Sequence, residues 1–319
     1  MFIEEQLTTI IPDRLAGWRT DQALAELFPD FSRSRLQKWM KDGFVLVDGE
    51  KLRPKDSVVG GELVELLVVV DDETQWSAEP IALDIVHEDD QIFVINKPPG
   101  LVVHPGAGNK HGTLSNGLLH YYPQIASVPR AGIVHRLDKD TSGLLVVAKT
   151  LAAHKSLVDQ LQARKVKREY MALCNNVMTA GGTVDAPIAR HPTNRLRMAV
   201  RDNGKPAISH YRVEKRFRAH TLVRVNLETG RTHQIRVHMT YIGYPLVGDA
   251  VYGGRLKIPP GCSDDFANAL RHFKRQALHA ASLGLEHPTS REWMQWQAEV
   301  PNDMQHLIEL AEQDSRNQT

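Results

Sequence analysis

The chain has 319 residues, of which 42% are hydrophobic and 24% charged, a composition that excludes a largely disordered, collagen-like or coiled-coil protein and suggests about two folded domains. No apolar run approaches the roughly 20 residues of a membrane helix, and the N-terminus lacks the basic and apolar regions of a signal peptide. The two cysteines are far apart and favour a reducing compartment over a disulfide framework, so we expect a cytoplasmic protein that does not contact a membrane.

Charge is distributed unevenly along the chain, although its sum is only +1. Residues 91–319 carry 30 Lys and Arg against 18 Asp and Glu, whereas residues 71–90 carry 8 acidic residues and no basic one. A basic C-terminal body favours a polyanionic partner such as nucleic acid, because cations neutralise phosphates and release counterions. Many basic domains are merely soluble, so the charge alone leaves the partner open.

Residues 1–72 are expected to form a small α+β module. Apolar spacing predicts helices over residues 21–28 and 33–41, the second with Ser32 as N-cap and Gly43 as its stop. Strands are predicted over residues 44–47 and 63–70.

The second predicted helix has two different faces. Its apolar stripe is Leu36, Trp39 and Met40, and the other face is cationic. That face could contact RNA phosphates or simply be solvated. The cations are Arg33, Arg35, Lys38 and Lys41.

An acidic stretch, residues 73–90, is expected to be a linker to a second domain of residues 91–319. Around and beyond it, apolar patterns predict a hairpin over residues 85–97, a strand over 143–148, a helix over 150–164 and a strand over 170–174. Further strands are predicted within residues 208–227, followed by a helix that begins just after Gly230.

The segment HRLDKDTSG, His135–Gly143, is a polar loop that leads directly into a predicted buried strand. Loops held by rigid strands often carry function. A carboxylate among the cations of this loop would stay ionised and could act as a nucleophile, because neighbouring cations lower carboxyl pKa values. A salt-bridged turn uses the same residues, and the pattern does not decide between Asp138 and Asp140.

A second polar segment, ETGRTHQIRVH, covers Glu228–His238. A glycine turn here opens a helix whose free N-terminal amides favour anions. Arg231 and Arg236 add positive charge, with ordinary ion pairing as the alternative. We do not expect a metal site, because His233 and His238 are five positions apart and face apart.

The segment RKVKREY, Arg164–Tyr170, places four cations before an aromatic residue at a strand start. Arg164 and Lys167 could position phosphate while Tyr170 stacks on a base. Simple packing of the ring is the alternative. The turn Asn96–Gly100 is explained by its prolines and is assigned no direct chemistry.

Together and in this order, the segments INKPPGLVVHPGAG, GIVHRLDKDTSGLLVVAK, KREY, LETGRTHQIRVHM and YPLVGDAVYGG resemble the successive motifs of pseudouridine synthases of the RluA type. The resemblance covers nearly the whole chain. It implies an α+β fold with a mixed, mainly antiparallel catalytic sheet, and an N-terminal RNA-binding module similar to that of ribosomal protein S-four. The implied activity converts specific uridines of 23S ribosomal RNA, in the helix 69 stem-loop, to pseudouridine without metal or organic cofactor.

The resemblance also implies roles for single residues. Asp138, and not Asp140, matches the catalytic aspartate; Tyr170 matches the active-site tyrosine, and Arg236 matches the residue that pairs with the aspartate. Arg136 matches an arginine that displaces the target base. Further RNA contacts are expected from Arg33, Arg35, Lys38, Arg164, Lys167 and Arg231.

The expected partner is 23S ribosomal RNA or an intermediate in the assembly of the large ribosomal particle, bound by a monomer that does not act on DNA. Two other functions use the same features. One is a non-catalytic assembly factor that binds the same RNA. The other is a nucleic-acid glycosidase, which would release free uracil.

Overall fold

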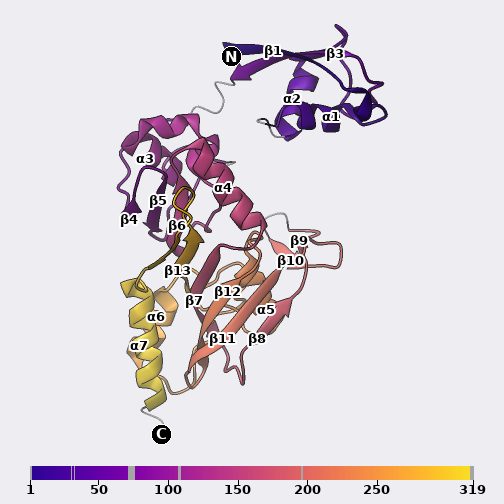
Figure 1. Cartoon of the computed structure of the whole chain (residues 1–319). Coiled ribbons are helices and arrows are strands. Elements are labelled where there is room, and N and C mark those ends of the chain that lie inside the picture. Colours follow the sequence, from indigo (N-terminus) through magenta and orange to yellow (C-terminus); the bar gives the residue numbers. More distant parts are fainter. Residues whose placement is uncertain are drawn as a thin grey trace. The chain divides into compact units, whose positions relative to one another are not determined.

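The computed structural model describes residues 2–29, 31, 33–70, 76–106, 109–194 and 197–316. The chain forms two compact units, residues 1–75 and 76–319 (Figure 1). Among the described residues, no helix combines the length and the apolar character needed to cross a membrane.

The N-terminal unit packs two helices against a three-stranded antiparallel sheet of order β1-β3-β2. Its core includes Leu24, Leu36, Trp39 and Leu66, so the apolar stripe predicted for the second helix is confirmed. The predicted N-cap Ser32 lies outside the described residues. The elements are β1 (Phe2–Ile10), a short 3-10 helix (Asp13–Leu15), α1 (Thr20–Leu27), α2 (Arg33–Asp42), β2 (Val45–Val47) and β3 (Leu63–Val70).

The second unit begins at Trp76, earlier than the sequence suggested. Residues 71–75 of the acidic stretch lie outside the described residues, but residues 76–90 are not a linker. Leu83 and Ile85 pack against the main core, and β4 (Ile85–Glu88) pairs with β5 (Ile92–Lys97) as the predicted hairpin. Acidic residues alternate with these apolar ones, so the charge is compatible with a strand that buries one side.

The second unit is built on a nine-stranded sheet of order β4-β5-β6-β13-β7-β12-β11-β8, with β14 also paired to β13. All pairings are antiparallel except that of β6 with β13. The remaining strands are β6 (Ser142–Ala148), β7 (Lys167–Asn175), β8 (Gly182–Asp185), β11 (Ile208–Arg216), β12 (His220–Leu227), β13 (Leu278–Glu286) and β14 (Trp293–Gln297), beside a separate ribbon of β9 (Ile188–Arg190) and β10 (Met198–Val200).

Helices cover both faces of this sheet. Strand β6 shows why, because Leu145 and Val147 face one core cluster and Leu144 and Val146 face another, which is the pattern of a strand buried on both sides. The helices are α3 (Leu114–Tyr121), α4 (Leu151–Gln162), α5 (Gln234–Tyr241), α6 (Asp264–His272) and α7 (Asn302–Arg316), with 3-10 turns at Pro123–Ser127 and Pro129–Gly132. The strand and helix assignments made for residues 143–174 and 208–241 are confirmed to within a few residues.

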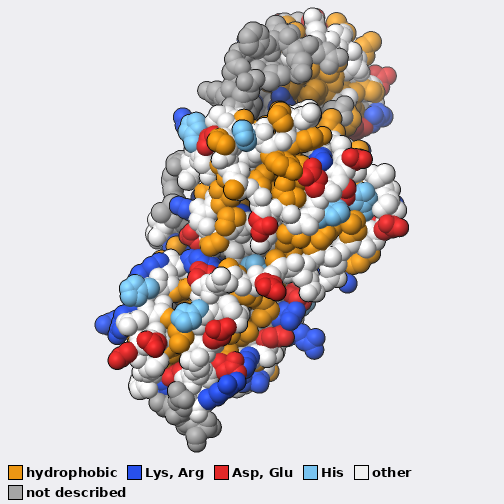
Figure 2. Space-filling view, turned by 90° about the vertical axis from the view of Figure 1, so that its left-hand side faces the viewer, with side chains coloured by type: hydrophobic (Ala, Val, Ile, Leu, Met, Phe, Trp, Pro, Cys, Tyr) orange, Lys and Arg blue, Asp and Glu red, His pale blue; other side chains and the backbone are white. Residues whose placement is uncertain are grey.

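One face of the second unit carries charged side chains of both signs. Figure 2 shows one face, on which acidic and basic side chains are interspersed around α6 and α7. The positive surplus of residues 91–319 is therefore not concentrated on that face.

Candidate active site

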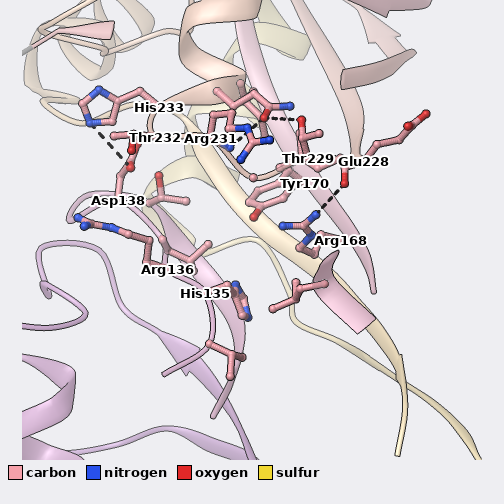
Figure 3. A pocket seen from close by; sticks show the side chains of 18 of the residues that line it. His135, Arg136, Asp138, Arg168, Tyr170, Glu228, Thr229, Arg231, Thr232 and His233 are labelled. Carbon is pink, nitrogen blue, oxygen red and sulfur yellow. Dashed lines mark hydrogen bonds and ion pairs between the residues drawn. The ribbon is translucent and has the colours of Figure 1, made fainter. Parts of the chain in front are cut away.

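A cavity of about 630 Å³ opens where three segments meet (Figure 3). They are the loop that precedes β6, the start of β7, and the loop that leads into α5. The lining residues extend from His104 to Leu278 in the sequence, so the fold brings positions 174 apart to one place. The predicted site residues that line the cavity are Arg136, Asp138, Arg164, Tyr170, Arg231 and Arg236.

Arg236 holds the carboxylate of Asp138 in a fixed orientation. Its Nη1 donates to Oδ2 of Asp138 at 3.1 Å, while Nε and Nη2 donate to the two carboxylate oxygens of Asp249 at 2.7 and 2.9 Å. Asp249 is buried and also accepts from the backbone N–H groups of Val251 and Tyr252. Burial lowers the pKa of Arg236, but the two carboxylates outweigh it and keep the pKa above its usual value. Arg236 is therefore a fixed cation.

The loop that carries Asp138 is anchored by His135 and by Lys97. The Nε2 atom of His135 accepts a hydrogen bond from the N–H of Val146 at 3.1 Å, and burial lowers the pKa of His135 to about 3, so the ring is neutral. Lys97 is fully buried. Its Nζ donates to the carbonyl oxygens of Pro98, Leu101 and Lys139 at 2.7, 2.9 and 2.9 Å.

The turn that contains Lys97 was assigned no chemistry from its sequence. In the structure it fixes the loop that carries Asp138, through the hydrogen bond from Lys97 to the carbonyl oxygen of Lys139. Asp140, the other acidic residue of the loop, is not among the residues that line the cavity. Its backbone oxygen faces Nη1 of Arg275 at 3.5 Å. The two carboxylates that the sequence pattern could not separate therefore differ in position.

Tyr170 lies on β7 and is almost fully buried, yet it lines the cavity. Burial raises the pKa of its phenol, so the hydroxyl keeps its proton at neutral pH. In Figure 3 the ring lies between Asp138 and Arg168. Both charges act on the phenol electrostatically.

His233 also lies close to Asp138. It has a left-handed backbone, with φ at 57°, and immediately precedes α5. The hydroxyl of Tyr252 accepts from the N–H of Met198 and lies 2.8 Å from Nδ1 of His233. The hydroxyl proton is therefore assigned to that contact, which leaves the ring proton on Nε2. This atom lies 3.9 Å from Oδ1 of Asp138.

Three predicted RNA-binding arginines surround the cavity. Nη1 of Arg136 lies 3.5 Å from Nε2 of His104. Nη1 of Arg164 donates to Glu228 at 2.7 Å, and Nε of Arg231 donates to the carbonyl of Pro206 at 3.0 Å. Lys167 is not brought to the cavity, because its Nζ lies over the ring of Trp293, 5.1 Å from the centroid.

The three predicted RNA-binding residues of the N-terminal unit lie along α2. Arg33 pairs with the buried carboxylate of Asp21 at 2.7 Å, and Arg35 lies over the ring of Trp39, 4.7 Å from the centroid. Lys38 is exposed. Within the part of the chain that the structure describes, no group of three His, Cys, Asp or Glu side chains could hold a metal ion.

The family model described as RNA pseudouridylate synthase matches residues 91–241, and the S4 domain model matches residues 18–64. A Yersinia pestis protein named ribosomal large subunit pseudouridine synthase D is 57% identical over 311 residues, which cover 97% of this chain and 96% of that one. Its namesake in Xanthomonas campestris pv. campestris is 55% identical over 306 residues, 96% and 92% of the two chains. This chain belongs to the RNA pseudouridylate synthase family.

Solved structures agree with this assignment. Human RNA pseudouridylate synthase domain containing 4 aligns with a TM-score of 0.56 and 26% identity over 72% of this chain and 92% of its own. Human RNA pseudouridylate synthase domain containing 1 aligns with a TM-score of 0.54 and 26% identity over 70% and 85%. The synthase thus has a pseudouridine synthase domain that follows an S4 domain in the chain, and the predicted α+β class, RNA-binding module and enzyme activity are confirmed.

Several residues that shape the site of the synthase were missed in the sequence. His233 had been considered only as a metal ligand, Arg168 only as one of four cations before Tyr170, and Lys97 only as part of a turn without direct chemistry. The four residues besides His233 lie in segments that carry the resemblance to the family. Those segments indicated where the site is, but not which residues contact Asp138, Arg236 and the cavity. The four residues are Lys97, Arg168, Asp249 and Tyr252.

Proposed function

We propose that the synthase converts specific uridines of 23S ribosomal RNA to pseudouridine, in the helix 69 stem-loop, with Asp138 as the catalytic residue. The observation that carries the proposal is the pairing of Asp138 with Arg236 in a cavity that Tyr170 also lines. Relatives named ribosomal large subunit pseudouridine synthase D support the ribosomal substrate. The partner is naked RNA or an assembling ribosomal particle in the cytoplasm, and the synthase acts as a monomer that does not modify DNA.

The substrate uridine must leave the base stack before it can react. The base detaches at N1, turns and rejoins through C5, and no duplex interior gives room for that rotation. Unstacking costs a few kcal/mol and is cheapest in a loop. Arg136 displaces the base, while Arg164 and Arg231 bind phosphates at the cavity. The S4 domain adds contacts through Arg33, Arg35 and Lys38.

Breaking the glycosidic bond develops positive charge at the ribose C1′, and the carboxylate of Asp138 stabilises it. The hydrogen bond from Arg236 orients that carboxylate. Direct attack at C1′, attack on the base and a glycal-type elimination all use an aspartate in this place. The ring of Tyr170 stacks on the flipped base during its rotation. The overall change moves one proton from C5 to N1 and conserves mass.

The test compares ribosomal RNA from cells with and without the gene, by carbodiimide labelling and primer extension. Signals should disappear from helix 69 on deletion and return with the wild-type gene. Asp138→Asn should fold and bind RNA but restore no signal. Asp140→Asn is the matched control, because it removes a neighbouring carboxylate that does not line the cavity. Unchanged signals in the deletion strain, or turnover by Asp138→Asn, would contradict the proposal.

A further inference from the structure

Arg168 is a buried cation that no carboxylate of the described residues neutralises. It is 8% exposed, and its Nε is buried without a hydrogen-bond partner. The hydrogen bond of its guanidinium runs from Nη2 to the carbonyl oxygen of Glu228 at 3.3 Å. The carboxylate of Glu228 is turned instead to Arg164 and His210, each at 2.7 Å.

Other buried arginines of the same unit are neutralised. Arg236 bonds to two aspartates, and Arg275 forms a two-fold contact with Asp303 at 2.7 Å. Burial without a counterion lowers the pKa of Arg168, although a guanidinium keeps its proton in proteins. A desolvated charge is costly unless a partner arrives, so the position favours an anion that comes with the substrate.

Arg168 lines the same cavity as Asp138 and Tyr170. Arg168 and Tyr170 are alternate residues of β7 and therefore lie on the same side of the sheet. Both line the cavity, and Tyr170 lies between Asp138 and Arg168 (Figure 3). A uridine with its C1′ at Asp138 and its base on the Tyr170 ring would thus direct the far edge of the base toward Arg168.

Gly230 keeps the loop close to this guanidinium. A Cβ added at Gly230 would lie 2.6 Å from Nη1 of Arg168. The backbone of Gly230 does not have a positive φ. Here the glycine is needed for the space that Arg168 occupies, and not for its backbone conformation.

We propose that Arg168 is a catalytic residue that stabilises the detached uracil ring as an anion, an inference that rests on the proposed function. When the C1′–N1 bond breaks, its electron pair stays with the ring and spreads over N1, O2 and O4. The N–H groups of Arg168 donate to this charge. Asp138 stabilises the sugar at one end of the cavity, and Arg168 stabilises the leaving base at the other.

The anion then turns over the ring of Tyr170, and C5 forms the new bond to C1′. The proton on C5 passes to water and N1 takes one proton from water, so atoms and charge balance with solvent as the only other participant. Preorganised donors aimed at developing charge are worth about 100- to 1000-fold in rate. Arg168 needs no rearrangement to act, because it is already desolvated and held.

The experiment measures the single-turnover rate at saturating RNA and, separately, the dissociation constant of the RNA. Arg168→Gln should lower the rate about 100-fold and leave the dissociation constant within about 3-fold. Arg212→Gln is the control, because it removes an arginine on β11 that does not line the cavity. Weaker RNA binding with a normal rate at saturation would overturn the inference and identify Arg168 as a phosphate contact.

A second substrate separates catalysis from a structural role. Fluorine at C5 stabilises the uracil anion, so RNA that carries 5-fluorouridine depends less on a cation to break its glycosidic bond. The rate loss of Arg168→Gln, followed as consumption of the substrate nucleoside, should therefore be clearly smaller with this RNA. An equal loss with both RNAs would mean that the substitution only disturbs the cavity, and would overturn the inference.

A second variant covers the case in which Arg168→Gln does not fold. Gly230→Ala keeps the charge but displaces the guanidinium, and it should lower the rate with the same dependence on fluorine. A normal rate in Gly230→Ala would also count against Arg168. The wild type is assayed in parallel on both RNAs. If it makes no pseudouridine from the uridine RNA, the proposed function itself fails, whereas normal wild-type turnover with unaffected variants removes only the role of Arg168.

Discussion

Nε2 of His233 faces Oδ1 of Asp138 across 3.9 Å. The distance is too long for a hydrogen bond, yet Tyr252 already orients the ring so that its N–H points toward the carboxylate. Oδ2 of the same carboxylate is bonded to Arg236. The two oxygens of Asp138 therefore have different partners, and a small rotation on substrate binding would give the second one a hydrogen bond.

His233 is accordingly expected to position Asp138. His233→Ala should slow single turnover roughly 10-fold, which corresponds to about 1.4 kcal/mol. Tyr252→Phe should have a similar effect, because the ring of His233 then loses its fixed tautomer. The double variant should be no slower than the slower single one, since both substitutions break the same contact. Additive losses would show that the two residues act independently.

The pair of Arg236 with Asp249 should be essential for folding as well as for activity. Asp249→Asn leaves a buried guanidinium without its main partner and should destabilise the protein by about 3–5 kcal/mol. Asp303→Asn is the matched control. Its contact with Arg275 has the same two-fold geometry, but the side chain of Asp303 is 49% exposed, so about 1 kcal/mol is expected. Urea unfolding measures both.

Gly132 should not tolerate a side chain. It follows two residues with left-handed backbone, Arg130 and Ala131, and has a φ of 74°. A Cβ there would lie 1.9 Å from the carbonyl oxygen of Ala148, so Gly132→Ala should cost about 3 kcal/mol or more. Gly100 has a similar φ, 84°, with nothing within 4 Å. Gly100→Ala should cost only about 1–2 kcal/mol for backbone strain, and equal losses in urea unfolding would contradict this account.

Low pH should destabilise the second unit, residues 76–319, partly through His135. Its folded pKa is about 3, because burial lowers it from 6.5, so between these values the unfolded chain binds a proton that the native chain does not. Stability from this group is complete above pH 6.5 and is lost as the pH falls, by at most about 1.4 kcal/mol per pH unit. Unfolding of His135→Gln should show a shallower pH dependence in that window. If the free energy of unfolding of His135→Gln depends on pH as steeply as that of the wild type, another group causes the acid sensitivity, for example His220.

Removal of the N-terminal unit should affect binding more than chemistry. That unit has its own hydrophobic core, and the described groups that anchor Asp138 all lie at Lys97 or beyond it in the chain. A protein that starts at Trp76 should bind RNA about 10-fold more weakly, the equivalent of about 1.4 kcal/mol. Its rate at saturating RNA should stay within a few-fold of the full chain. Equal affinity and equal site selection without the unit would contradict a role in RNA binding.

Local signals predicted much of this architecture. The helices around Leu36 and Leu157 and the strands that hold Leu145 and Val223 follow from apolar periodicity, turns and caps. The strand β1 was not predicted, because Phe2–Ile10 was read only for a signal peptide. Residues 76–90 were misjudged, since acidic composition was given more weight than the alternation of Ile81, Leu83 and Ile85.

The site itself was only partly visible in the sequence. Polar loops after Gly132 and after Leu227 pointed to chemistry, and the resemblance selected Asp138 within the first of them. The partners of that residue depend on chain segments that meet only in the folded molecule. Lys97 donates to three backbone carbonyl groups, and Asp249 accepts from the guanidinium of Arg236 on α5. The direction of a backbone carbonyl cannot be predicted from the spacing of apolar residues in a sequence.

The position of β13 has a consequence for the newly made chain. This strand, Leu278–Glu286, separates β6 from β7 in the middle of the sheet although it comes last among the three. Asp138 and Tyr170 are therefore held on two half-sheets that this strand does not join until residue 286 or so has been translated. Such late, long-range closure is slow. The cavity that holds Asp138 and Tyr170 is therefore expected to form late in folding, after β13 has paired with both of its neighbours.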